Sequence, residues 1–230
     1  KINGLDAELW RVHAVSAGDK IELGFATEGC RSYLAVAGGF IINESFGSTA
    51  TVVRESLGGL AGDKLKAGDI LPAHAADGVV ENVLAEHLRP DYTGDIVLRV
   101  IPGYQQHAFS RFQQRLFFGS DYEVSDRCDR MGYRLTGAEI KPSIDGILSE
   151  GICLGAIQVP ADGQPIVLLN DRQTIGGYPK IGSMMSLDVA RLGQCMPGAK
   201  ISFQAVTIDC AHNALCLAES HFQRAEATAL

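Results

Sequence analysis

Two arginines separated by one glycine are the first residues that could bind an anion. Residues 129–135 read DRMGYRL. On a β-strand alternate side chains share a face, so Arg130, Gly132 and Arg134 are predicted to lie together. Gly132 would leave an opening between two guanidinium groups, which can hold a carboxylate or a phosphate through paired hydrogen bonds. A solvated strand face with two ordinary arginines explains the same pattern.

Two glutamines on either side of a tight turn form a second candidate group. Gln158 and Gln164 flank Asp162-Gly163, where glycine can adopt the positive φ of a hairpin turn. An amide side chain both donates and accepts hydrogen bonds, which suits recognition of a lactam, a urea or a ureido group. A plain hairpin with solvated polar residues is the structural alternative.

The third group is the irregular segment 170–180, NDRQTIGGYPK. Adjacent Gly176 and Gly177 could direct successive backbone N–H groups at one anion, forming an oxyanion or phosphate cradle. Asp171 could act as a general base or as a ligand of Mg²⁺. An ordinary Gly-Gly loop is the alternative. The further predicted substrate-binding residues of this segment are Gln173, Thr174, Tyr178 and Lys180.

Composition and missing motifs narrow the classes of function. The net charge of −7 argues against a nucleic-acid partner, which would need clustered Lys and Arg. There is no apolar run long enough to span a membrane and no leader pattern, so we expect a cytoplasmic protein without a membrane partner. The six cysteines lack zinc-site spacing, so no metal site of their own is expected. No Walker A or G-x-G-x-x-G loop appears, so any ATP site would be unconventional.

Short apolar runs between Gly-Asp turns predict a mainly β (α+β) protein with a few short helices. A helix-like spacing over 79–88, followed by Pro90 and Gly94, places a lobe boundary there. We therefore expect a β-rich N-terminal lobe over residues 1–94 and a C-terminal β-barrel lobe, carrying the main motifs, over residues 95–230. Strands are predicted at 20–25, 31–37, 69–73, 96–102, 131–135, 155–160, 166–170 and 200–206, and further helices at 105–118, 187–195 and 209–225, the last with Thr207 as N-cap.

Five segments taken together resemble one known family. They are 31–39 (RSYLAVAGG), 58–62 (GGLAG), 130–135 (RMGYRL), 157–165 (IQVPADGQP) and 171–179 (DRQTIGGYP). Their order and content are similar to the allophanate hydrolase subunit 2 family, also called the biotin-dependent carboxyltransferase family, which includes one component of bacterial 5-oxoprolinase. The resemblance runs over nearly the whole chain.

The resemblance implies a cyclophilin-like open β-barrel and work within a complex. In the 5-oxoprolinase case, ATP with Mg²⁺ drives opening of the 5-oxoproline lactam to glutamate, and the partners are a sibling B component and a further A component of the same complex. Other relatives transfer a carboxyl group from carboxybiotin to urea, and a further relative pairs with a kinase-inhibiting protein. These activities share one scaffold, so the fold alone cannot choose among them. We expect ATP-dependent opening of the 5-oxoproline lactam, with carboxyl transfer and a non-enzymatic regulatory role as the alternatives.

Two departures from the family pattern affect these expectations. The chain begins with Lys1, and the family's N-terminal quarter has no counterpart in it, so we expect missing upstream residues. Ile175 stands where the family commonly has Thr before Gly-Gly, which removes a hydroxyl from the predicted cradle. We expect the isolated chain to be inactive.

Overall fold

The computed structural model describes residues 1–76, 78–92, 96–225 and 227–229, and the chain forms two units. The N-terminal unit comprises Lys1–Gly24, Ser32–Arg89 and Glu226–Leu230. The barrel unit comprises Phe25–Arg31 and Pro90–Ala225. The predicted boundary between residues 94 and 95 lies outside the described residues.

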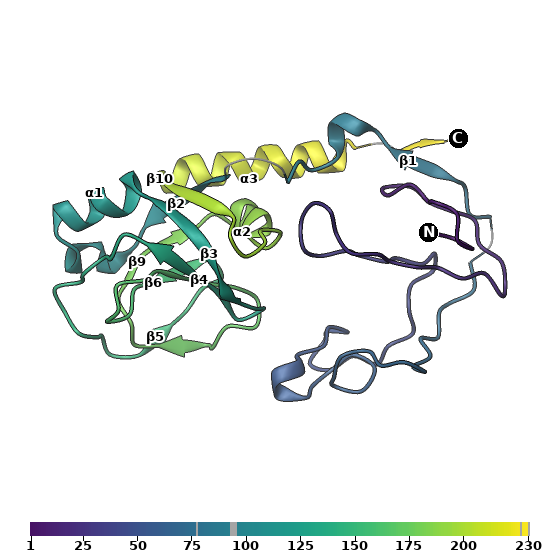
Figure 1. Cartoon of the computed structure of the whole chain (residues 1–230), viewed down its shortest axis with the longest axis horizontal. Coiled ribbons are helices and arrows are strands. Elements are labelled where there is room, and N and C mark those ends of the chain that lie inside the picture. Colours follow the sequence, from purple (N-terminus) through teal and green to yellow (C-terminus); the bar gives the residue numbers. More distant parts are fainter. Residues whose placement is uncertain (77, 93–95, 226, 230) are drawn as a thin grey trace. The chain divides into compact units, whose positions relative to one another are not determined.

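A closed β-barrel forms the centre of the barrel unit (Figure 1). Strand β10 pairs in parallel with β2 and antiparallel with β3, which completes the ring. The mainly β architecture predicted from sequence is confirmed, but the ring is closed rather than open. In order around the ring the strands are β10 (Lys200–Ala205), β2 (Ile96–Pro102), β9 (Lys180–Met184), β6 (Ala156–Gln158), β7 (Ile166–Leu168), β4 (Gly132–Gly137) and β3 (Asp121–Cys128).

Alternation of apolar side chains along the strands fills the barrel. Leu98 and Val100 of β2 are buried, as are Tyr133 and Leu135 of β4, because alternate residues face the same side. Aromatic packing closes one part of this core, where the rings of Phe117 and Phe203 stack with centroids 4.5 Å apart. The core therefore belongs to the barrel unit.

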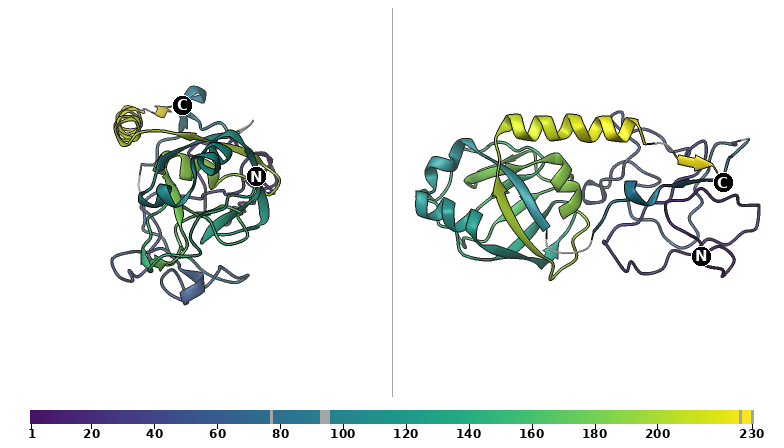
Figure 2. Two further views of the ribbon diagram at one scale, coloured as in Figure 1. Left: turned by 90° about the vertical axis from the view of Figure 1, so that its left-hand side faces the viewer. Right: turned by 90° about the horizontal axis from the view of Figure 1, so that it is seen from above.

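Three α-helices accompany the barrel: α1 (Arg111–Gly119), α2 (Ser186–Leu192) and α3 (Ile208–Gln223). Figure 2 shows α3 as a long helix running from the end of β10. Thr207 is its N-cap, as predicted, and its side chain accepts a hydrogen bond from the Cys210 backbone at 3.2 Å. The helix predicted over 105–118 is divided into the 3₁₀-helix η3 (Tyr104–Ala108) and α1. No helix among the described residues is long and apolar enough to cross a membrane.

A buried carboxylate fixes helix α2 on strand β2. Asp188 is fully buried and accepts hydrogen bonds from Arg99 Nε at 2.8 Å, from Nη2 at 2.6 Å and from the Arg99 backbone at 2.6 Å. This pairing raises the pKa of Arg99, with the Asp188 hydrogen bond as the main cause. These three hydrogen bonds attach the first turn of α2 to strand β2.

A short N-terminal segment belongs to the barrel unit because the side chain of Gln194 binds its backbone. Gln194 Oε1 accepts hydrogen bonds from the backbone N–H groups of Cys30 at 3.0 Å and of Arg31 at 2.8 Å. Arg31 also donates from Nη1 to the Tyr133 hydroxyl at 3.0 Å. Burial raises the pKa of that hydroxyl to about 12.

The N-terminal unit has little regular structure. Its strand β1 (Asn82–Leu84) pairs with β11 (Ala227–Ala229). Its described residues also form two short 3₁₀-helices, η1 (Val53–Glu55) before β1 and η2 (Glu86–Leu88) after it. Among its described residues no hydrophobic side chain is buried. The strands predicted at 20–25, 31–37 and 69–73 are wrong: only isolated bridges form at residues 21 and 73. The helix predicted over 79–88 is also wrong, because β1 and η2 occupy that range.

Candidate functional site

Arg130 and Asp171 form a two-pronged ion pair at the start of the predicted loop. Arg130 Nε donates to Asp171 Oδ2 at 2.7 Å, and Nη2 donates to Oδ1 at 3.0 Å. The backbone N–H of Asp171 also donates to the Arg130 carbonyl at 2.9 Å. Each carboxylate oxygen therefore accepts a hydrogen bond from Arg130, and the role of Asp171 as general base or Mg²⁺ ligand stays a prediction.

The predicted arginine clamp around Gly132 is not formed. Arg130 precedes β4 and is paired with Asp171, whereas Arg134 is exposed on β4. A Cβ atom at Gly132 would lie 2.9 Å from the Val167 carbonyl oxygen of the neighbouring strand. The glycine is thus required by close strand packing and leaves no opening for an anion.

Gln158 carries a buried amide donor without a partner. Its side chain is 1% exposed, and among the described residues its Nε2 has no hydrogen-bond acceptor. A Cβ atom at Gly176 would lie 2.8 Å from this Nε2 and 2.5 Å from Ile152 Cδ1, so only glycine fits over the amide. A buried unsatisfied donor costs about 1–3 kcal/mol. This unsatisfied donor makes Gln158 a candidate for binding a ligand.

A polar cluster lies on the strand next to Gln158, which is paired with Lys180 in the sheet register. The Lys180 ammonium donates to Glu150 Oε1, and Gln105 Nε2 donates to the same oxygen at 2.7 Å. These hydrogen bonds hold the pKa of Glu150 below its usual value, with the Lys180 bond as the larger cause. Lys180 is therefore an oriented, mostly buried cation at this end of the barrel.

A small two-stranded ribbon positions Gly176 over Gln158. It consists of β5 (Glu150–Gly151) and β8 (Ile175–Gly176), paired antiparallel. The predicted cradle of converging N–H groups is not formed, because Gly176 is a strand residue and neither Gly176 nor Gly177 has positive φ. The Gly177 carbonyl accepts a hydrogen bond from the Ile147 backbone at 2.8 Å, so this segment is held as a strand edge.

The remaining predicted residues divide between structural and exposed positions. Gln164 binds the end of β4: its Oε1 accepts from the Gly137 N–H at 2.9 Å and its Nε2 donates to the Gly137 carbonyl at 3.3 Å. Its amide is thus used within the fold. Tyr178 is about half exposed, and Gln173 and Thr174 are exposed.

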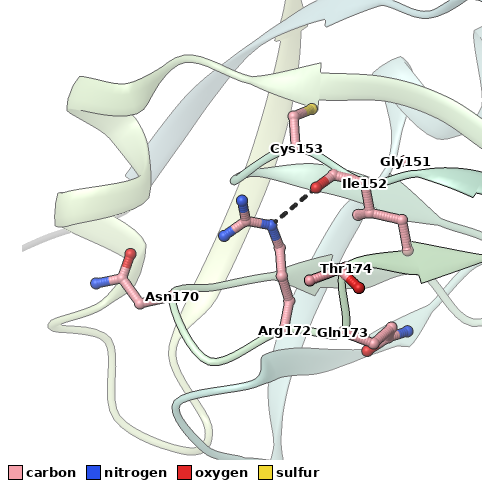
Figure 3. A pocket seen from close by; sticks show the side chains of 7 residues that line it. All are labelled: Gly151, Ile152, Cys153, Asn170, Arg172, Gln173 and Thr174. Carbon is pink, nitrogen blue, oxygen red and sulfur yellow. Dashed lines mark hydrogen bonds between the residues drawn. The ribbon is translucent and has the colours of Figure 1, made fainter. Parts of the chain in front are cut away.

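Gln173 and Thr174 line a shallow pocket of about 580 Å³ (Figure 3). The pocket lining also contains residues that the sequence reasoning missed, namely Gly151, Ile152, Cys153, Asn170 and Arg172. Asn170 and Arg172 lie within the segment 170–180, so their polar side chains could have been predicted as binding residues from the sequence. Cys153 gave no signal in the sequence, because only the fold brings it to this pocket and places its Sγ 3.2 Å from the Ser183 hydroxyl.

The predicted residues therefore form three neighbouring groups along one loop. Arg130 is joined to the beginning of the loop through Asp171, the pocket follows at Gln173 and Thr174, and Gln158 lies against Gly176 near its end. Within the described ranges, no three His, Cys, Asp or Glu side chains gather as metal ligands.

A family model described as "Carboxyltransferase domain, subdomain A and B" matches residues 1–205. The chain belongs to this carboxyltransferase domain family. The predicted family resemblance is thereby confirmed, and the barrel is the framework on which the family motifs 130–135, 157–165 and 171–179 meet.

Individual relatives agree with this assignment. The chain is 38% identical over 201 residues to the C component of the Escherichia coli 5-oxoprolinase, covering 87% of this chain and 64% of that protein. It is 31% identical over 225 residues to a putative urea carboxylase of Emericella nidulans, covering 90% of this chain and 18% of that protein. The solved urea amidolyase of K. lactis superposes with a TM-score of 0.85 at 24% identity, over 94% of this chain and 14% of that one, which shows a shared fold. The chain thus spans less than two thirds of each of these proteins.

Proposed function

We propose that this chain is one component of an ATP-dependent 5-oxoprolinase complex that opens the lactam of 5-oxoproline to glutamate. The observation that carries the proposal is the 38% identity to the C component of 5-oxoprolinase over 87% of the chain. The sibling B component and the A component of such a complex are the proposed partners. ATP with Mg²⁺ is the proposed cofactor of the complex. We place this complex in the cytoplasm.

The geometry near Gln158 supports recognition of a cyclic amide. The unpartnered Nε2 of Gln158 is a donor for a lactam carbonyl oxygen, and a hydrogen bond at that oxygen would stabilise the negative charge that develops when the ring is attacked. The β5–β8 ribbon lies over this donor through Gly176, so the ribbon must move for substrate to reach it. Lys180 lies at the same end of the barrel, where it forms an ion pair with Glu150.

Carboxyl transfer from biotin to urea or a related amide is a second candidate. It is favoured by the carboxyltransferase family itself and by the 31% identity to a putative urea carboxylase. These 230 residues contain no Met-Lys-Met sequence of a biotin carrier, so carboxybiotin would have to come from outside them. A non-enzymatic regulatory protein that binds the same partners is the third possibility.

Reconstitution separates these functions. The complete native polypeptide that contains this chain is co-purified with its sibling components. Two reactions are then measured separately: ATP hydrolysis with 5-oxoproline, and transfer of the carboxyl group from carboxybiotin to urea. The proposal predicts ATP hydrolysis that depends on 5-oxoproline and on the presence of this polypeptide. Activity with urea and carboxybiotin alone would favour the second function, and activity with neither would favour a regulatory protein.

A further inference from the structure

Arg172 places a cationic group in the pocket lined by Asn170, Cys153 and Thr174. Its Nε donates to the Ile152 carbonyl at 3.1 Å and its Nη1 donates to the Leu169 carbonyl at 3.1 Å. Figure 3 shows the bond to Ile152 and the two terminal nitrogens of the guanidinium directed away from it. The backbone thus holds the guanidinium in a fixed orientation and leaves further N–H groups for a ligand.

This guanidinium lacks a carboxylate partner among the described residues, although it is partly buried. The adjacent carboxylate, Asp171, is paired with Arg130, and among the described residues no hydrogen bond or ion pair joins it to Arg172. A charge that is partly removed from water is unfavourable unless a counter-charge lies close to it. The pocket therefore offers a positive charge at which a small anion would be stabilised.

We propose that Arg172 binds the carboxylate group of the substrate, a small carboxylic acid that also carries an amide. The planar guanidinium can present paired N–H groups to a carboxylate, as an ammonium cannot. Thr174 and Asn170 line the same pocket and supply a hydroxyl and an amide for the remaining polar atoms of such a ligand. This inference rests on the proposed function, and it assigns to Arg172 the role that the sequence had suggested for Arg130 and Arg134.

The test compares two lactams in the reconstituted complex. 5-Oxoproline carries the carboxylate, and 2-pyrrolidinone has the same ring without it. Arg172→Gln removes the charge but keeps donors for the backbone carbonyl groups, and Arg115→Gln, on the exposed side of α1, is the matched control. We expect Arg172→Gln to raise KM for 5-oxoproline about 10- to 100-fold. KM for 2-pyrrolidinone should change less than about twofold, and Arg115→Gln should change neither. Equal effects on both lactams, or no effect on either, would overturn the proposal.

A binding measurement separates this subsite from the reaction itself. Ligand-observed NMR without ATP records binding of 5-oxoproline and of 2-pyrrolidinone to the wild-type and Arg172→Gln complexes, and thermal unfolding confirms that the variant is folded. Selective loss of 5-oxoproline binding in the variant supports the subsite. If the wild-type complex also turns over no lactam, the subsite still stands and only the proposed function fails. Unchanged binding of 5-oxoproline by the folded variant overturns the subsite whatever the turnover. If Arg172→Gln does not fold, Arg172→Lys is used with the same two ligands and the same criteria.

Discussion

Arg130 donates two hydrogen bonds to Asp171, from Nε to Oδ2 at 2.7 Å and from Nη2 to Oδ1 at 3.0 Å. The pair joins Arg130, two residues before β4, to the first residues of the loop that carries the pocket. A positioning role for Arg130 follows from this geometry, because its effect on the pocket passes through Asp171 and Arg172.

Replacing Arg130 by Lys should therefore affect activity more than stability. The Arg130 side chain is 56% exposed, so loss of the fork should change the free energy of unfolding by less than about 1 kcal/mol. A loop held less firmly should lower kcat/KM of the complex about 3- to 30-fold, since small displacements of substrate-binding groups reduce the reaction rate. Steady-state kinetics and urea unfolding measure the two quantities.

Arg134→Lys is the matched control for this experiment. Arg134 is exposed on β4, and its replacement should leave unfolding within about 0.5 kcal/mol and kinetics unchanged. A larger loss of kcat/KM in Arg134→Lys than in Arg130→Lys would restore the arginine clamp predicted from sequence.

The Lys180–Glu150 pair should make the β5–β8 ribbon sensitive to acid. Hydrogen bonds from Lys180 and Gln105 lower the pKa of Glu150 from 4.5 in the folded state. The stability contributed by this carboxylate is then fully present above pH 4.5, the unfolded value, and is lost as pH falls through the lower folded value. Hydrogen exchange, corrected for its intrinsic pH dependence, should show less protection at residues 150–152 and 174–176 in that acid range. Glu150→Gln should remove this dependence, and a variant that retains it would contradict the assignment to Glu150.

Burial of Cys195 should make its thiol resistant to alkylation. Burial raises the pKa of this thiol to about 11, so only about one molecule in a thousand carries the reactive thiolate at pH 8. The exposed thiols of Cys153 and Cys210 should react with iodoacetamide in the native protein, whereas Cys195 should react only after unfolding. Peptide mapping by mass spectrometry checks this, and labelling of Cys195 as fast as Cys153 in native protein would disagree.

Periodicity predicted most of the barrel strands. Strands β2, β4, β6, β7 and β10 lie within or overlap the predicted ranges, because their inward residues share one core. Strands β3 and β9 were not predicted, although Tyr122 and Val124 of β3 alternate with exposed residues. The short ribbon strand β8 was missed because its two residues pair only across the fold with β5. In the N-terminal unit the same alternation failed, because the described part of this unit has no buried apolar side chains to hold paired strands together.

The sequence selected residues that the fold brings near one another, but it did not predict their contacts. Sequence identified the segment 170–180 and Gln158, which the fold does bring close to one another. It assigned Arg130 and Asp171 to a ligand, whereas they bind each other, because ion pairing between positions 41 residues apart in sequence is decided by tertiary structure. The need for glycine at 132 and 176 likewise comes from a neighbouring strand and a buried amide, which composition cannot reveal.

Conversion of ¹³C-labelled 5-oxoproline to glutamate, followed by NMR with ATP present, tests the central claim most directly. The wild-type complex should form glutamate, and Gln158→Leu should reduce its rate about 100-fold or more by removing the amide donor. The free energy of unfolding of this variant should equal that of wild type or exceed it by up to about 1 kcal/mol. The reason is that leucine is similar in size to glutamine and has no buried donor to leave unsatisfied. Absence of glutamate with the wild-type complex, or a wild-type rate in the folded Gln158→Leu variant, would contradict the proposed function and the role given to Gln158.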